Sequence, residues 1–171
     1  AGLPLDMELI NGELKRRQGG YGRGARQKME TDTATFLTGV RRGQTIGSPL
    51  VVEVANKDSR LDETPDLLKP RPGHADLAGA TKWLLTDART TLERASARET
   101  AARVAAGALA QQLLDLFGIT AFGYVAELGP IKIEPRPGSL AEQRAIRDAS
   151  EVYSLNPDQD EEIKTLIDRC Q

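Results

Sequence analysis

Six basic residues and four glycines crowd into one short segment near the start of this sequence, and no acidic residue lies among them. Arginine side chains match phosphate and carboxylate oxygens in bidentate fashion, and glycine lets backbone N–H groups come close to a ligand. The segment from 15 to 28 therefore predicts an anion-binding loop. Its residues are Lys15, Arg16, Arg17, Arg23, Arg26 and Lys28, with Gly19, Gly20, Gly22 and Gly24.

The same loop has two plainer interpretations: a solvated turn, or a tether that makes the chain an anion- or RNA-binding module. A formal net charge of −2 argues against general adhesion to nucleic acids or membranes, so the basic loop is a local site in an acidic chain. Tyr21 is the one aromatic residue of the loop, and aromatic residues make up only 4% of the sequence, which leaves little surface for stacking on bases. We therefore expect no nucleic-acid partner.

The only histidine, His74, lies in a second unusual run. Pro70 and Pro72 stiffen the approach to it, and Gly73 removes bulk just before the ring, which is how a chain presents a side chain to a pocket. A lone histidine is more often structural or solvated than catalytic. Both interpretations stay open for His74 at this point.

A third run opens a long helical pattern and carries Arg94, Ser96 and Arg98. A helix N-terminus with a hydroxyl group and two arginines forms an anion or cofactor site. The plainer interpretation is an ordinary N-cap followed by an arginine on the helix surface.

The elements before His74 explain how the basic loop is positioned. Asp6 is a cap for a short predicted helix that ends at Gly19 and delivers Arg17 to the loop. The alternating, β-branched residues from 33 to 54 predict an antiparallel hairpin. Residues 56–72 are polar and rich in proline, and they predict an irregular excursion.

The second half of the sequence predicts helices and one strand region. Helices are predicted over 74–83 and 96–117, and the second is so rich in alanine that we expect it to be buried on several sides in the centre of the fold. Residues 119–133 predict a strand or a pair of strands broken near Gly129-Pro130, and further helices are predicted after Ser139 and Asn156. This order favours an α+β fold with a single domain over 1–171.

Composition limits the remaining function classes. The single cysteine, Cys170, excludes an internal disulfide and a cysteine-based metal cluster, and it fits a reducing compartment. No apolar run approaches the roughly 20 residues that a membrane span requires. The expected location is cytoplasmic, with no metal centre and no membrane partner.

The three runs, in this order and at this separation, resemble three signatures of the chorismate synthase family. The matching residues are 16–24, 71–76 and 94–100, and the stretches between them are similar as well. The resemblance implies an α+β fold in which a sandwich of antiparallel sheets encloses helices. Such enclosure would suit the alanine-rich helix.

The resemblance also implies an activity, that of a lyase in the shikimate pathway of aromatic amino acid biosynthesis. The reaction is a 1,4-trans elimination of phosphate from 5-enolpyruvylshikimate 3-phosphate, which gives chorismate. It uses reduced FMN (FMNH2) without a net redox change, so the enzyme is a flavoprotein. Either NADPH bound by the same protein or a separate reductase supplies the reduced flavin.

The family's site residues carry over to matching positions. Arg17, Arg23 and Arg98 match arginines that bind the phosphate and carboxylates of the substrate, and the first two lie where some members bind a nicotinamide nucleotide. His74 matches the histidine thought to protonate the reduced flavin, so we expect it to be catalytic. The flavin-binding segment is Arg94, Ala95, Ser96 and Ala97.

Members of the family are roughly twice as long as this chain of 171 residues. We therefore expect an incomplete chorismate synthase domain that lacks an N-terminal strand, with a second family histidine, and the C-terminal half. Because these parts complete the flavin and phosphate contacts, we expect the fragment alone to be inactive. The full-length protein is expected to be a homotetramer.

Overall fold

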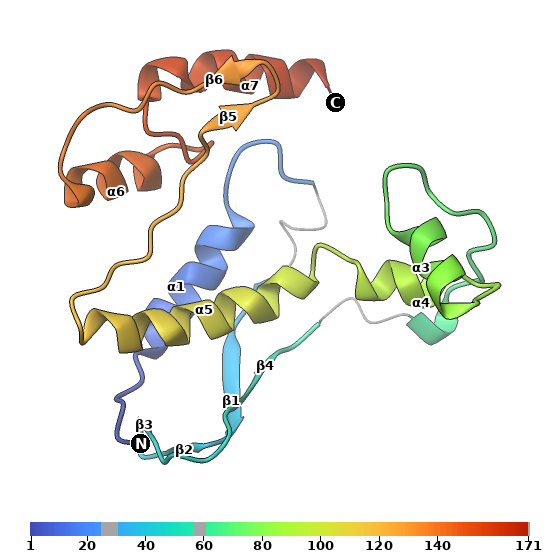
Figure 1. Ribbon diagram of the computed structural model, residues 1–171, viewed down its shortest axis with the longest axis horizontal. Coiled ribbons are helices and arrows are strands. Elements are labelled where there is room, and N and C mark those ends of the chain that lie inside the picture. The colour runs from blue at the N-terminus through green and yellow to red at the C-terminus, as the bar shows by residue number, and fades with distance from the viewer. Residues whose placement is uncertain (25–30, 57–60, 171) are drawn as a thin grey trace.

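The computed structural model describes residues 1–24, 31–56 and 61–170, and Arg26 and Lys28 of the predicted loop lie outside this part. Helices and short antiparallel strands share the described part, which confirms the α+β class. Figure 1 shows three regions, which we call the body, the arm and the C-terminal layer.

The body contains two helices that lie side by side, α1 (Met7–Gln18) and α5 (Glu99–Asp115). Asp6 caps α1 by accepting a hydrogen bond from the Leu9 N–H at 3.0 Å, and Gly19 ends the helix, as predicted. Burial of their facing apolar side chains holds the two helices together. The core cluster comprises Ile10, Leu14, Ala34, Ala101, Ala105 and Ala108.

A small sheet completes the body and confirms the predicted hairpin. β1 (Ala34–Thr38) pairs antiparallel with β4 (Val51–Val54), and the chain between them forms a second ladder from β2 (Val40–Arg41) and β3 (Gln44–Thr45). Because β4 packs on α5, the residues just before β1 lie close to the first turn of that helix.

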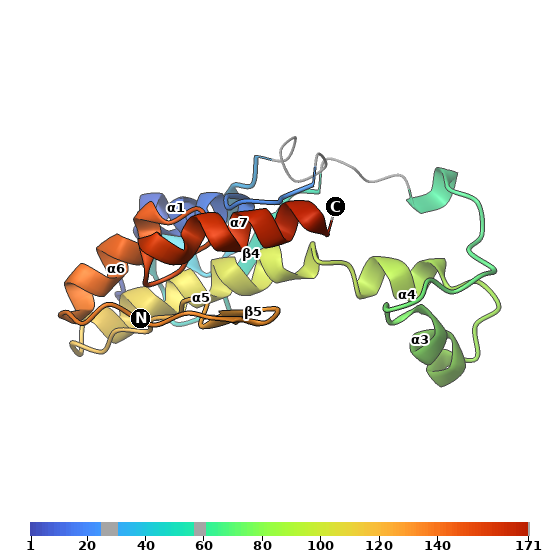
Figure 2. The same cartoon turned by 90° about the horizontal axis from the view of Figure 1, so that it is seen from above.

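The arm contains a 3-10 turn (Leu61–Glu63) and two short helices, α3 (Asp76–Trp83) and α4 (Arg89–Arg94). It extends beyond the N-terminal end of α5 in both views (Figures 1 and 2). Gly79 lets α3 approach α4 closely, because a Cβ at this position would overlap the side chain of Thr91. The described residues between the 3-10 turn and α3 are irregular, as predicted.

The C-terminal layer has a second apolar cluster, formed by Ile133, Val152 and Ile163. The helices predicted after Ser139 and Asn156 are confirmed, and the first begins with a capping box formed by Ser139 and Glu142. The elements are β5 (Glu127–Leu128), β6 (Ile131–Lys132), α6 (Leu140–Ala149), a 3-10 turn (Pro157–Gln159) and α7 (Asp160–Arg169).

Two predictions about this half of the chain are wrong. The alanine-rich helix begins at Glu99 rather than at Ser96, because residues 95–98 form a turn. It is buried along one stripe instead of on several sides, since each described sheet has only two strands and none covers its outer face. The predicted pair of strands broken near Gly129-Pro130 is confirmed by β5 and β6, although residues 119–126 of the predicted range are irregular.

Candidate anion and cofactor site

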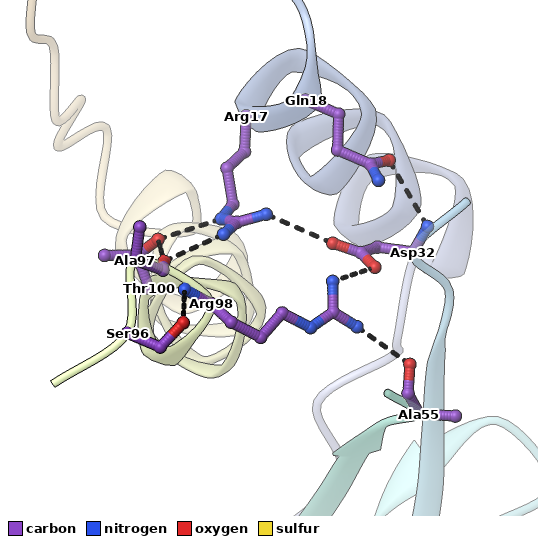
Figure 3. Close-up of polar contacts among 8 residues, drawn as sticks. All are labelled: Arg17, Gln18, Asp32, Ala55, Ser96, Ala97, Arg98 and Thr100. Carbon is purple, nitrogen blue, oxygen red and sulfur yellow. Dashed lines mark hydrogen bonds and ion pairs between the residues drawn. The ribbon is translucent and has the colours of Figure 1, made fainter. Parts of the chain in front are cut away.

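Two of the predicted substrate-binding arginines meet on one buried carboxylate (Figure 3). Arg17 comes from the last turn of α1, Arg98 precedes α5, and Asp32 lies between them just before β1. Arg17 Nη1 donates to Asp32 Oδ2 at 3.2 Å, and Arg98 Nη1 donates to Asp32 Oδ1. Only 1% of the Asp32 side chain is exposed, so ion pairing with these arginines takes the place of water at its oxygens.

Further oxygens fix both guanidinium groups. Arg17 Nε donates to Thr100 Oγ1 at 2.9 Å, and Arg17 Nη2 donates to the Ala97 carbonyl at 2.9 Å. Arg98 Nη2 donates to the Ala55 carbonyl at 2.8 Å, which ties the end of the hairpin to the start of α5. Two guanidinium groups and one carboxylate leave this cluster with net positive charge, which suits an anionic ligand.

A glycine turn after α1 presents the third predicted arginine, Arg23. Gly20 has a φ of +100°, a region that favours glycine, and a Cβ there would lie 3.1 Å from the Tyr153 ring. Tyr153 Oη donates to the Arg16 carbonyl at 2.5 Å, so the C-terminal layer supports this turn. Arg23 Nε donates to the Gly19 carbonyl at 2.8 Å and leaves the rest of its exposed guanidinium beside the turn.

Arg17 and Arg23 line a common cleft of about 410 Å³. A neighbouring cleft of about 330 Å³ is lined by Arg94, Ser96 and Arg98. The first of these volumes falls within the range of about 300–1,000 Å³ that is usual for small-molecule sites, and the second lies at its lower end. The other residues lining the larger cleft are Glu13, Arg16, Ala97, Thr100, Val104 and Tyr153.

The predicted flavin-binding segment, 94–97, forms the turn between α4 and α5. Ser96 Oγ accepts a hydrogen bond from the Arg98 N–H at 3.2 Å and so shapes this turn. Arg94 and Ala95 also line a third cleft of about 480 Å³, which reaches into the arm. Thr91 lines it too, and the Thr91 hydroxyl is buried without a hydrogen-bond partner among the described residues.

His74 belongs to a separate cluster just before α3. Arg71 donates from Nε and Nη2 to the two oxygens of Asp76, at 2.8 and 3.0 Å, and Asp76 is fully buried. These bonds from Arg71 hold the pKa of the Asp76 carboxyl well below its usual range. His74 Nδ1 lies 2.8 Å from Asp76 Oδ1 and 3.0 Å from Arg71 Nη2, and because an ionised carboxylate only accepts hydrogen bonds, the contact with Asp76 favours a proton on Nδ1. The Nε2 atom is then the ring nitrogen that can exchange a proton with a ligand.

The structure therefore gathers the predicted residues into two places. Arg17, Arg23, Arg98 and the 94–97 segment surround neighbouring clefts, whereas His74 lines none of these three clefts. Sequence reasoning missed the two acids that organise these places, Asp32 and Asp76. Their only signals in the sequence are an acid at the start of a β-branched run and an acid two residues after the single histidine.

Two other features, a membrane-spanning helix and a metal-ion site, are not found among the described residues. None of their helices has both the length and the apolar character that crossing a membrane requires. In the same ranges, no group of three or more His, Cys, Asp or Glu side chains is placed to hold a metal ion.

Known proteins with similar sequences share one description. The family model for chorismate synthase matches residues 1–171. The chain is 45% identical to chorismate synthase of Streptococcus sanguinis (strain SK36) over 186 residues, which covers 100% of the chain and 48% of that protein. It is 46% identical to the Acidobacterium capsulatum chorismate synthase over 184 residues, with 99% of the chain and 47% of that protein covered. The chain thus spans about half the length of the curated relatives it matches.

A solved structure gives the same result for the fold. A crystal structure of chorismate synthase superimposes with a TM-score of 0.77 and 40% sequence identity, covering 99% of this chain and 46% of that chain. The sequence match extends over every residue of the chain, and the fold agrees with it. The chain belongs to the chorismate synthase family.

Proposed function

We propose that this chain carries the substrate arginines of a chorismate synthase, which eliminates phosphate from 5-enolpyruvylshikimate 3-phosphate to give chorismate. One observation carries the proposal: Arg17 and Arg98, from elements far apart in sequence, meet at Asp32, and Arg23 shares a cleft with Arg17. The substrate has one phosphate and two carboxylates, so it requires several cations in one place. Arginines fixed by the fold stabilise the negative charge that grows on the departing phosphate.

The residues of the third cleft fit a flavin in size and in lining. Its volume of about 480 Å³ lies within the usual range for cofactor sites, and its lining combines apolar Trp83 and Leu85 with the charged residues Arg94, Glu99 and Arg103. We propose that the turn of Arg94, Ala95, Ser96 and Ala97 holds reduced FMN, with Arg94 and Ala95 in this cleft and Ser96 and Ala97 at the two neighbouring clefts. When bound, the flavin supplies the electron-rich ring that the elimination uses without net redox change. NADPH is the proposed source of its reduction.

His74 is the proposed proton donor to the reduced flavin. The Asp76 carboxylate holds the proton on Nδ1, so Nε2 is the position that gives up or takes a proton. His74 lies just before α3 of the arm and Arg17 lies in α1 of the body, so the proposed site includes both regions. The remaining step, removal of the C6 hydrogen of the substrate, has no assigned residue in this chain.

The larger assembly is also a proposal. We propose that the two-stranded sheets belong to a sandwich of antiparallel sheets that covers α5, within one domain that includes residues 1–171. The exposed outer face of α5 and the doubled length of the relatives support this arrangement. We also propose that the full-length protein is a cytoplasmic homotetramer. The 171 residues alone are proposed to lack activity.

The alternative of an RNA-binding module has less support. Tyr21, the aromatic residue of the loop, packs on the second core cluster, and its hydroxyl donates to the Asp168 carboxylate at 2.8 Å. A ring fixed in this way cannot move freely to stack on a base.

Calorimetric titration of this chain with FMN, with and without 5-enolpyruvylshikimate 3-phosphate, tests the proposal. We expect the substrate to tighten FMN binding, because both ligands share the turn at 94–98. Arg23→Met should weaken substrate binding by about 10- to 100-fold, which is the usual effect of losing a charge-assisted hydrogen bond. Arg136→Met is the matched control, since Arg136 pairs with Asp158 away from the clefts. Equal effects of the two variants, or binding of RNA in place of the substrate, would contradict the proposal.

A further inference from the structure

We propose that Asp32 is a positioning residue for the anionic substrate. Its carboxylate holds Arg17 and Arg98 in one arrangement, so that both guanidinium groups act on the ligand as a unit. This inference rests on the proposed function, because it names a residue that prepares the same site.

Asp32 lies behind the arginines rather than in the clefts. Arg17 lines the cleft of about 410 Å³ and Arg98 lines the cleft of about 330 Å³, whereas Asp32 lines neither of them. Figure 3 shows its carboxylate between the two guanidinium groups, one oxygen toward each. The Asp32 N–H donates to Gln18 Oε1 at 3.2 Å, which fixes the acid to the end of α1. Asp32 therefore touches the arginines and not the space that a ligand would fill.

The two arginines are held before any ligand arrives. Arg17 uses three of its five N–H groups for Asp32, Thr100 and the Ala97 carbonyl. Its side chain is only 10% exposed, and that of Arg98 is 18% exposed. A long side chain that is already fixed loses little conformational freedom on binding, so this arrangement favours affinity and specificity.

Charge alone does not explain an acid at this place. Asp32 cancels one of two positive charges, so a site that needed only positive potential would bind anions better without it. The Asp32 carboxylate therefore weakens the electrostatic attraction of an anion, but it holds the two arginines in a fixed arrangement. These two effects have opposite signs, and two ligands separate them: inorganic phosphate, which one guanidinium satisfies, and 5-enolpyruvylshikimate 3-phosphate, whose three anionic groups need several fixed cations.

The test is titration calorimetry of the chain and of Asp32→Asn with both anions. We expect Asp32→Asn to weaken binding of 5-enolpyruvylshikimate 3-phosphate about tenfold, since two long side chains must then be ordered on binding. Inorganic phosphate should bind as tightly as before or more tightly. Asp158→Asn, which removes an equal charge at an exposed site, should change neither affinity. A loss of folding or a change of charge alone would not weaken substrate binding while phosphate binding stays the same or becomes tighter.

The results separate failure of the inference from failure of the proposed function. If the wild-type chain binds the substrate and Asp32→Asn changes both affinities by the same factor, Asp32 is not a positioning residue and the proposed function survives. If the wild-type chain binds inorganic phosphate but not the substrate, the proposed function itself fails. Should Asp32→Asn not fold, Gln18→Ala loosens Asp32 without removing its charge. We expect it to weaken substrate binding about threefold and to leave phosphate binding unchanged, and an unchanged substrate affinity would overturn the inference.

Discussion

At the scale of single residues, buried carboxylates organise both candidate places. Asp32 joins Arg17 to Arg98, and Asp76 joins Arg71 to the only histidine. A buried charge is costly unless it is paired and hydrogen-bonded, so each acid requires its partners to stay where they are. Residues that bind a ligand can thereby be ordered by residues that never touch it.

Asp76→Asn should lower the melting temperature at neutral pH, because Arg71 then loses its ionised partner. The pKa of Asp76 is lowered in the folded chain, so its stabilising contribution is complete above the unfolded value of about 3.9 and falls as the pH drops below it. The difference in melting temperature between wild type and variant should therefore stay constant above about pH 5 and shrink as the pH falls from about 4 toward 2. Thermal melts across this range measure it, and a difference that stays constant would contradict the assignment.

The residues that the sequence predicted differ in kind from those that it did not. Arg17 and Arg98 carry a charge within a motif, so their chemistry is visible without a structure. Both arginines pair with Asp32, which lies 15 residues from Arg17 and 66 residues from Arg98 in the sequence. The contact forms only in the folded chain, where β4 packs on α5. Pairings at such separations leave no periodic pattern in a single sequence.

At the scale of elements, close packing of α3 on α4 depends on one glycine. Gly79→Ala should lower the free energy of unfolding by about 1–3 kcal/mol, because the new Cβ would overlap Thr91 and overpacking has a cost of this size. Gly107→Ala is the matched control within α5, where a Cβ meets nothing within 4 Å. That control should raise stability by up to about 1 kcal/mol, since alanine favours helix more than glycine does. Chemical denaturation measures both, and equal effects would disprove the packing argument.

The contribution of the capping box at the start of α6 to stability can be tested separately. Ser139→Ala should lower the free energy of unfolding by about 1 kcal/mol, because the Ser139 hydroxyl accepts the Glu142 N–H and closes a capping box. Ser139→Thr keeps the hydroxyl and should cost much less. Denaturant melts compare the two variants, and a Thr variant as unstable as the Ala variant would show that the cap is not the cause.

Helix and strand ends follow local rules, which explains why most of them could be predicted. The caps at Asp6, Gly19, Ser139 and Asn156 involve residues a few positions apart in the sequence. Burial of α5 does not follow such rules. The small side chains of this helix allow enclosure on every side, but its actual burial depends on which other elements cover it, and the described residues cover one stripe.

At the scale of the whole molecule, α5 connects all three regions and leaves one end exposed. Its buried stripe faces α1 and β4, and its N-terminal turn leads to the arm. Leu116 and Phe117, just after α5, are 68% and 72% exposed. Adjacent apolar side chains of this size at the surface favour association.

The double substitution Leu116→Ser with Phe117→Ser should reduce self-association of this chain and its binding of a hydrophobic dye. The melting temperature should stay within about 2 °C of wild type, because both side chains are mostly exposed and removing them opens no cavity. Sedimentation velocity at several concentrations and dye fluorescence measure the effect. Ile46→Ser, at an exposed apolar residue outside this end of α5, serves as the control and should change association little. A wild-type chain that stays monomeric and dye-free would contradict the prediction that this end of α5 favours association.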